Sequence, residues 1–448
     1  MTENSAGRPS DDDDARRFNP REFEEFLKRY LADPSQFDMA DLANQAGFPT
    51  DPQEVAKLLK HLQDAISLQG GMEEGVNWKL AVDQAKQVAR KDNRAILDAQ
   101  RVALTEAGNI AALWLDGATT VSQLVSEPKL LTRDLWVDDV MPLLRQLSEP
   151  VANRMSDALS EHLRSSAPAE LDVVLQGAAG LMRSAGGAMF GMQLGQAVGR
   201  LSEQVISGSD LGLPIFTEQR AAYLPQNLAQ FVLDLGVDQR EALIYLCVRE
   251  QAHARLFKHS RWLREAVVTQ ITAYAADISI DEGRLLDLAE TQDLSNPDQL
   301  KQLLESGALI SERTDEQTRA LESIETLLAL VEGWVQAVTE QATALLPKSA
   351  ALSEAIRRRR SSGGPAEQVF STLIGLDLRP RRLREATQMW RDLTTMLGNE
   401  KRDALWDHPD LLPTGGELGN AKLVVERLNA AGEGDDFDQA LRDLLDGN

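Results

Sequence analysis

The stretch Asp238–His259, DQREALIYLCVREQAHARLFKH, predicts the helix around which the rest of the chain is organised. Asp238 can cap the free backbone amides of a first turn, and Glu241, three residues later, can complete a capping box. The polar residues Arg249 and His253 are one helical turn apart and should face the protein, because apolar residues recur at helical steps around them: Ala242, Leu246 and Leu256.

The segment Arg249-Glu250-Gln251-Ala252-His253 has the spacing of the HExxH zinc-protease motif except at its first position. In HExxH, two histidines one turn apart bind the same zinc, and the glutamate polarises the attacking water. Glu250 and His253 therefore keep the positions of the base and of one ligand. Arg249 cannot bind zinc, since its guanidinium stays protonated in proteins.

Length and composition limit the classes of function. A chain of 448 residues with 43% hydrophobic residues can form two or three domains or one large enzyme core. Its net charge of −23 argues against a nucleic-acid or anionic-membrane partner. The single cysteine, Cys247, excludes an internal disulfide and a thiolate zinc site, and it fits a reducing cytoplasm.

No segment has the composition of a targeting signal or a membrane span. The N-terminus, MTENSAGRPSDDDD, lacks the basic start and apolar run of a signal peptide. The glycine-rich run Val173–Ile206 is interrupted by polar residues, namely Arg183, Gln193, Gln196 and Arg200. We therefore expect a cytoplasmic protein.

The hydrophobic pattern predicts a mainly helical protein with few short strands. We expect a disordered acidic tail at 1–18, a small helical extension at 19–70, a main domain at 76–418 and an acidic tail at 419–448. One short extended piece is expected at Leu213–Phe216. Long helices are predicted at Trp78–Arg90, Ile96–Asp116, Asp134–Ser165, Leu171–Ser207, Arg261–Ile278 and Asp315–Leu346.

Glycines occur at every fourth position in one predicted helix: Gly187, Gly191, Gly195 and Gly199. This spacing aligns them along one side, where another backbone can come very close. Since each glycine inside a helix costs about 1 kcal/mol relative to alanine, close packing should compensate. The partner on this side is either another helix of a buried core or a contact with an oligomer partner, another protein or a membrane.

A second long helix, Asp315–Leu346, carries a carboxylate within an apolar run, at Glu332. Thr314 and Gln317 can cap its start as a box. A carboxylate among apolar residues needs a partner. Glu332 is therefore a metal ligand, a partner for the polar pair of the first helix, or a solvated edge of this one.

Two arginine clusters follow, at Arg357–Arg360 and at Arg379–Arg384. Clusters of this kind can hold a phosphate or a carboxylate by paired hydrogen bonds. They can equally neutralise acidic neighbours, of which a chain with 70 acidic residues has many.

Several motifs together resemble one family: VNWKLAVDQAKQVAR, GLPIF, the RExxH helix with ARLFKHSRWLR, LLALVEGWV, GGPAEQVFSTLIGLDLRPRRLREA and ALWDHPDLLPT. They occur in the order found in the actinobacterial zincin-like family, whose members are named as hydrolases or zinc-dependent metalloproteases. The resemblance extends from Val76 to Leu418. The chain is also similar to a sister group associated with deazaflavin-coenzyme biosynthesis, in which the HExxH motif is intact.

The resemblance implies a zincin-like metallopeptidase fold and a zinc cofactor. It matches Glu250 to the catalytic glutamate, His253 to the second zinc ligand and Glu332 to a glutamate third ligand, with Arg249 in the place of the first ligand. The implied activity is hydrolysis of a peptide or protein substrate by metal-activated water, with Glu250 as general base.

Two classes of function stay open, because a catalytic zinc needs three protein ligands and an open position for water. A metallohydrolase with an altered ligand set would have to recruit His259 or His408 from outside the motif. In a catalytically inactive zincin-like protein, Arg249 would pair with Glu332 or Glu250 and His253 would donate to the carboxylate that remains. The cleft that holds the active site in active zincins would then serve as an interaction or scaffold surface.

Overall fold

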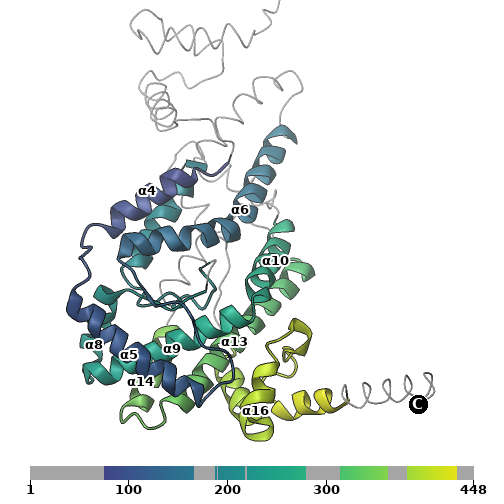
Figure 1. Cartoon of the computed structure of the whole chain (residues 1–448). Coiled ribbons are helices and arrows are strands. Elements are labelled where there is room, and N and C mark those ends of the chain that lie inside the picture. The colour runs from purple at the N-terminus through teal and green to yellow at the C-terminus, as the bar shows by residue number, and fades with distance from the viewer. Residues whose placement is uncertain are drawn as a thin grey trace, which may run out of the picture. The chain divides into compact units, whose positions relative to one another are not determined.

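Helices form almost all of the regular structure in the computed structural model of the chain (Figure 1). The structure describes residues 75–165, 187–188, 190–216, 219–278, 313–361 and 381–430. The expected tail at 1–18 and the expected extension at 19–70 lie outside these residues. Within them, the mainly helical fold class with few short strands is confirmed.

The elements follow one another along the chain as α4 (Trp78–Ala89), α5 (Asp98–Asp116), β1 (Lys129–Leu130), α6 (Arg133–Ser165), β2 (Ala222–Tyr223), α8 (Pro225–Leu235), α9 (Gln239–His259), α10 (Trp262–Ala276), α13 (Asp315–Ala342), α14 (Ser349–Ser361), α16 (Leu383–Ala404) and a 3₁₀ turn at Pro409–Leu411. Residues 190–202 and 421–430 are also helical.

The central helix α9 begins where its sequence indicates. The Asp238 side chain accepts a hydrogen bond from Glu241 N at 3.0 Å, as predicted for the cap. The Glu241 carboxylate does not close the expected box; it accepts a hydrogen bond from Lys348 N at 3.0 Å. On α13 the predicted box between Thr314 and Gln317 is present in full.

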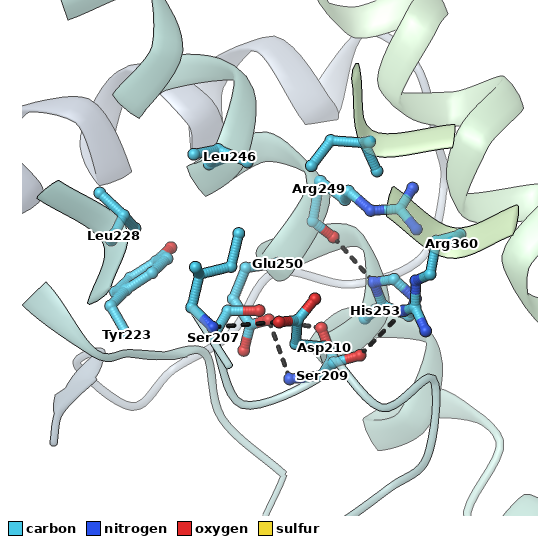
Figure 2. Close-up of a pocket in the computed structure, with 12 residues that line it drawn as sticks. Ser207, Ser209, Asp210, Tyr223, Leu228, Leu246, Arg249, Glu250, His253 and Arg360 are labelled. Carbon is cyan, nitrogen blue, oxygen red and sulfur yellow. Dashed lines mark hydrogen bonds between the residues drawn. The ribbon is translucent and has the colours of Figure 1, made fainter. Parts of the chain in front are cut away.

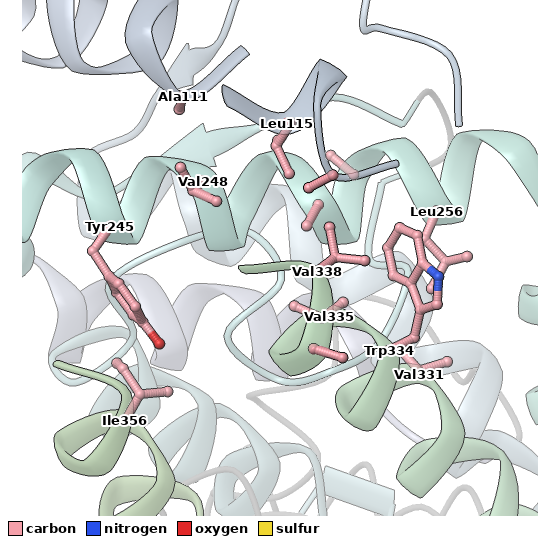
Figure 3. Close-up of a cluster of buried hydrophobic side chains, with 14 of the residues drawn as sticks. Ala111, Leu115, Tyr245, Val248, Leu256, Val331, Trp334, Val335, Val338 and Ile356 are labelled. Atoms are coloured by element: carbon pink, nitrogen blue, oxygen red, sulfur yellow. The ribbon is translucent and has the colours of Figure 1, made fainter. Parts of the chain in front are cut away.

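Helix α9 is buried around its whole circumference rather than along one face. It lies between α5 and α13, and Figure 3 shows side chains of all three helices meeting in one apolar cluster. Polar residues on α9 are satisfied by the neighbour they face: Gln251 donates to Gly108 O at 2.8 Å, and Arg255 donates to Asp116 at 2.9 Å. The apolar pattern did not predict that α9 is buried on all sides, because such a pattern assigns polar residues to the solvent-exposed face of a helix.

A second apolar cluster packs α4, α6, α10 and the helix at residues 190–202 against the N-terminal half of α13. Here the glycine row meets α4 directly. A Cβ built on Gly191 would lie 2.6 Å from Asn77 O, and one on Gly195 would lie 2.4 Å from Ala81 O. The predicted close backbone approach is thus present, and its partner on this side of the glycine row is α4 of the same chain.

The strands are two residues long, and they pair in parallel with Lys129 opposite Ala222 and Leu130 opposite Tyr223. Tyr223 also forms an antiparallel bridge with Ser207. The predicted extended piece at Leu213–Phe216 is not a strand in the structure, and the strands lie elsewhere. Two-residue strands give no alternating pattern that a sequence could reveal.

Residues 421–430 form a helix within the segment expected as an acidic tail, and Val424 is fully buried in the cluster around α9. In the part of the chain that the structure describes, no helix has the length and apolar composition needed to cross a membrane.

Candidate functional site

Four segments far apart in the sequence meet beside α9 (Figure 2). Helix α9 supplies Arg249, Glu250 and His253, α13 supplies Glu332, and α14 supplies Arg360. The loop at residues 207–212 and strand β2 complete the site.

Three groups converge on the Glu332 carboxylate. Arg249 Nη2 donates to Oε2, and Arg360 Nη2 donates to Oε1 at 2.7 Å. His253 Nε2 lies 3.1 Å from Oε1. Glu332 is 1% exposed, so these partners replace the water that a carboxylate otherwise binds.

Opposing effects determine the charge of Glu332. Burial raises its pKa, but the guanidiniums of Arg360 and Arg249, together with His253, outweigh burial and hold the pKa well below the ordinary value. The carboxylate is therefore ionised. A buried ion pair with Arg249 joins α13 to α9, and a partly buried one with Arg360 joins α13 to α14.

His253 faces an acceptor at each ring nitrogen. Its Nδ1 lies 3.2 Å from the backbone oxygen of Arg249, and its Nε2 faces the Glu332 carboxylate. A neutral imidazole carries one N–H, so both hydrogen bonds form together only in the doubly protonated ring. The contact from Nδ1 to a backbone carbonyl also resembles the way metal-binding histidines are oriented.

Glu250 points toward the loop and β2 instead of toward the Glu332 cluster. Its Oε2 accepts hydrogen bonds from Ser209 N at 3.1 Å and from Ser209 Oγ, and its Oε1 accepts one from Ala222 N at 2.9 Å. Three donors thus hold a carboxylate that is 2% exposed, and they fasten the loop and the strand to α9.

The segment Gly208-Ser209-Asp210-Leu211-Gly212 wraps these carboxylates closely. A Cβ on Gly208 would lie 3.0 Å from Glu250 Oε1, and one on Gly212 would lie 2.8 Å from Glu332 Oε1. Gly212 also has a φ of +70°, which side chains rarely allow. Glycine at both positions lets the loop pass over the two carboxylates.

A pocket opens between these elements, with about 330 Å³ of free space when the part open to solvent is counted. Figure 2 shows Tyr223 and Leu228 on one side of it and Arg249 and Arg360 on the other. Its full lining is Ile206, Ser207, Ser209, Asp210, Tyr223, Leu228, Leu246, Arg249, Glu250, His253, Ile356 and Arg360.

The first arginine cluster divides between the site and the surface. Arg360 binds Glu332, and Arg359 Nη2 donates to Asp210 at 2.6 Å, which ties α14 to the loop. Arg357 and Arg358 both pair with Glu354 on their own helix. In the second cluster, Arg382 pairs with Glu385 and Arg381 lies 3.5 Å from Glu325, while Arg379 lies outside the described residues. The interpretation that these clusters neutralise acidic neighbours fits each of these pairs.

The two histidines considered as substitute zinc ligands are engaged elsewhere. His259 Nε2 lies 2.7 Å from Asp407. His408 is exposed and caps the 3₁₀ turn, with its Nδ1 accepting a hydrogen bond from Asp410 N at 3.3 Å. Neither completes the cluster around His253 and Glu332.

These residues do not fit a zinc centre of the zincin type. Such a centre needs three nitrogen, oxygen or sulfur ligands, and the cluster offers His253 and Glu332. Both Glu332 oxygens accept hydrogen bonds from guanidiniums, and Arg249 places a fixed positive charge at the first ligand position. Among the described residues, no group of three or more His, Cys, Asp or Glu side chains is arranged to hold a metal.

The structure brings together all four residues that the motif and the apolar run singled out: Arg249, Glu250, His253 and Glu332. It adds Arg360, Ser209 and Gly212, which the sequence did not connect to the site. The arginine run and the paired glycines of the loop are visible as patterns. Nothing in a linear pattern shows that they meet α9.

Cys247 plays no part in the site. Burial raises the pKa of its thiol to about 12, so it remains a protonated core side chain.

Two of three comparisons with known proteins found a match. The family described as zincin-like metallopeptidase matches residues 76–424. A crystal structure from Chloroflexus aurantiacus, described as "a putative hydrolase with a novel fold", is similar with a TM-score of 0.54 and 17% sequence identity, over 79% of this chain and 99% of that chain. At this identity the likeness concerns the fold. A search of curated proteins found no match.

Proposed function

Because the chain belongs to the zincin-like metallopeptidase family, we propose that it is a member in which an arginine–glutamate cluster replaces the zinc centre. The pocket beside the cluster then serves to bind a ligand rather than to hydrolyse a peptide through zinc. The pair of Arg249 and Glu332 is the observation that carries this proposal. It puts a permanent cation on the carboxylate that the resemblance assigns to the metal.

The surroundings of Glu250 support the same conclusion. A general base needs a free lone pair aimed at its water. The Glu250 carboxylate accepts from Ser209 N, Ser209 Oγ and Ala222 N, and these bonds hold together the loop and the strand that border the pocket. Its role in the proposal is to position the loop.

A metal-dependent hydrolase is the second candidate, and one observation favours it. His253 Nε2 and Glu332 Oε1 are 3.1 Å apart, and zinc bonds of about 2.0–2.1 Å in a tetrahedron put two ligand atoms roughly 3.3 Å apart. For this candidate, Arg249 and Arg360 would both have to leave Glu332 and a third ligand would have to enter.

Metal content and hydrolysis together test the proposal. The full chain is purified without chelators, incubated with zinc, dialysed and measured by inductively coupled plasma mass spectrometry. Hydrolysis of a general peptide library is assayed on the same samples. Variants Glu250→Gln and His253→Ala are compared with His408→Ala, which changes an exposed histidine outside the site.

We expect far less than one zinc per chain, and no peptide hydrolysis that depends on Glu250 or His253. Roughly one tightly bound zinc per chain that disappears only in His253→Ala would overturn the proposal in favour of the hydrolase.

A further inference from the structure

The pocket beside α9 is almost closed by its own walls. Its volume of about 330 Å³ includes space that is open to solvent, and the enclosed part has room for about one water molecule. A larger ligand can therefore enter only when one wall moves. We propose that this wall is the last turn of α14, Arg357–Ser361, a gate that Arg359 and Arg360 hold shut and that opens by unwinding. The inference rests on the proposed function, because it concerns access to the same pocket.

Backbone contacts and burial hold the other walls in place. In the loop at residues 207–212, Ser209 N donates to Glu250 of α9 at 3.1 Å, and Ser207 forms a bridge with Tyr223 of β2. Helix α9 is itself buried around its circumference. Movement of these walls would break buried hydrogen bonds, which belong to the parts of a protein that open least often.

The last turn of α14 lies beyond the apolar anchors of its helix. Leu352 and Ile356 are 1% and 4% exposed and pack into the cluster around α9. The next four residues, Arg357–Arg360, are all arginines, and each of them is partly or largely exposed. Unwinding after Ile356 therefore uncovers no apolar side chain of the turn itself. Helix ends of this kind open at a much lower free energy than the core.

Two arginines of this turn clasp the pocket. Arg359 Nη2 donates to Asp210 of the loop at 2.6 Å, and its guanidinium lies 5.3 Å from the ring centre of Phe231 on α8. Arg360 Nη2 donates to Glu332 on α13 at 2.7 Å. The side chains of Arg359 and Arg360 are 22% and 15% exposed. Since water can replace the partners of partly exposed groups more easily than those of buried ones, this clasp can open and close.

Opening of the gate leaves the rest of the site intact. Arg249 pairs with Oε2 of Glu332, so its contact does not depend on Arg360. Arg360 and His253 share the other oxygen, Oε1, at 2.7 and 3.1 Å, and Figure 2 shows these two side chains beside each other. Withdrawal of Arg360 therefore uncovers Oε1 together with His253, which lines the pocket.

Hydrogen exchange of the full chain, followed by mass spectrometry of overlapping peptides, tests the gate. Arg359→Gln removes the ion pair with Asp210, and we expect amide exchange in the last turn of α14 to become about tenfold faster or more. Exchange in α9 should not change. The matched control is Arg357→Gln, which lies in the same turn but pairs with Glu354 of its own helix, and it should exchange like wild type.

Asp210→Asn provides a second arm from the side of the loop. It removes the charge that faces Arg359 and leaves the arginine itself unchanged, so we expect the same faster exchange in the last turn of α14. This variant decides the matter if Arg359→Gln fails to fold.

Labelling of an added thiol tests whether the gate controls access to the pocket. Ser207 lines the pocket, and iodoacetamide is larger than a water molecule, so it should reach the thiol of Ser207→Cys only past the open gate. Burial raises the pKa of the native Cys247 thiol to about 12, so this thiol should stay unlabelled. We expect Arg359→Gln to raise the labelling rate of Ser207→Cys about tenfold, and Arg357→Gln to leave it unchanged.

Exchange of the last turn at the wild-type rate in both Arg359→Gln and Asp210→Asn would overturn the gate. Faster exchange with unchanged labelling would overturn its role in access to the pocket, and faster exchange throughout α9 would mean general unfolding instead of a gate. Zinc content reports separately on the proposed function. A chain without zinc whose last turn stays closed would lose the gate and keep the proposed function.

Discussion

Arg249 Nη2 donates to Glu332 Oε2 across the contact between α9 and α13, and both side chains are buried. The resemblance to zinc proteases places a first metal ligand at position 249, and the structure places there a cation that binds the expected third ligand directly. The guanidinium supplies positive charge to Glu332 where the family pattern implies a metal.

Restoring the motif should restore zinc. Arg249→His puts a second imidazole one turn before His253 and frees Oε2 of Glu332. We expect this variant to bind roughly one zinc per chain, measured by mass spectrometry after zinc loading. Arg249→Gln, which removes the charge but offers no imidazole, should bind none.

Arg360 still holds the other oxygen of Glu332 in that variant, so Arg249→His combined with Arg360→Gln should bind zinc more tightly. Zinc contents for both histidine variants no higher than for Arg249→Gln would contradict the inferred relation between the cluster and the zinc centre.

Glu332→Gln should destabilise the fold strongly. It leaves the buried Arg249 and the partly buried Arg360 without a counter-charge, and breaking a buried ion pair costs about 3–5 kcal/mol. Glu316→Gln on the same helix breaks an exposed pair with Arg319 and should cost about 0–1 kcal/mol. Urea unfolding followed by circular dichroism compares the two. Equal losses would mean that the buried pairs contribute no more than a surface pair.

The contribution of Glu332 to stability should depend on pH in a defined direction. Its pKa in the folded state lies well below the ordinary value of 4.5, so the folded chain binds fewer protons there than the unfolded chain. The stabilisation is therefore fully present above pH 4.5 and is lost as the pH falls toward the folded-state pKa. Urea unfolding at several pH values should show that the difference in unfolding free energy between wild type and Glu332→Gln becomes smaller as the pH falls below 4.5. A gap that stays constant would contradict this assignment.

Gly212→Ala should destabilise the chain more than Gly236→Ala. Both glycines have positive φ, +70° and +62°, so both alanines carry a backbone cost of about 1–2 kcal/mol. A Cβ at Gly212 would also lie 2.8 Å from Glu332 Oε1, whereas one at Gly236 would meet nothing within 4 Å. The difference in stability between the two variants, measured by thermal unfolding, gives the cost of the contact with Glu332 apart from the cost of the positive φ. Equal losses would show that the loop adjusts freely around the carboxylate.

Gly195→Ala should be unfavourable even though alanine favours a helix by about 1 kcal/mol over glycine. The new Cβ would lie 2.4 Å from Ala81 O, and such overpacking costs about 1–3 kcal/mol. Gly117→Ala is the control, because its Cβ would lie at an ordinary 3.6 Å from Trp114 O. A stabilised Gly195→Ala in urea unfolding would mean that α4 does not pack tightly on the glycine row.

Local patterns predicted the helices well, since caps and periodicity act over a few residues. The Asp238 cap, the Thr314 box and the extents of α4, α5 and α10 agree with the sequence to within about two residues. The sequence did not predict the two short strands or the full burial of α9. Both depend on contacts with segments that are distant in the sequence.

The sequence by itself determined that Arg249, Glu250 and His253 share one helix in a degenerate zinc-protease motif, and that Glu332 needs a partner. Helical spacing and the chemistry of a buried carboxylate are sufficient for both statements. Only the tertiary structure decided which partners these are. It turned Glu250 toward the loop and brought Arg360 of α14 to Glu332, because ion pairs between distant helices follow from packing rather than from local sequence.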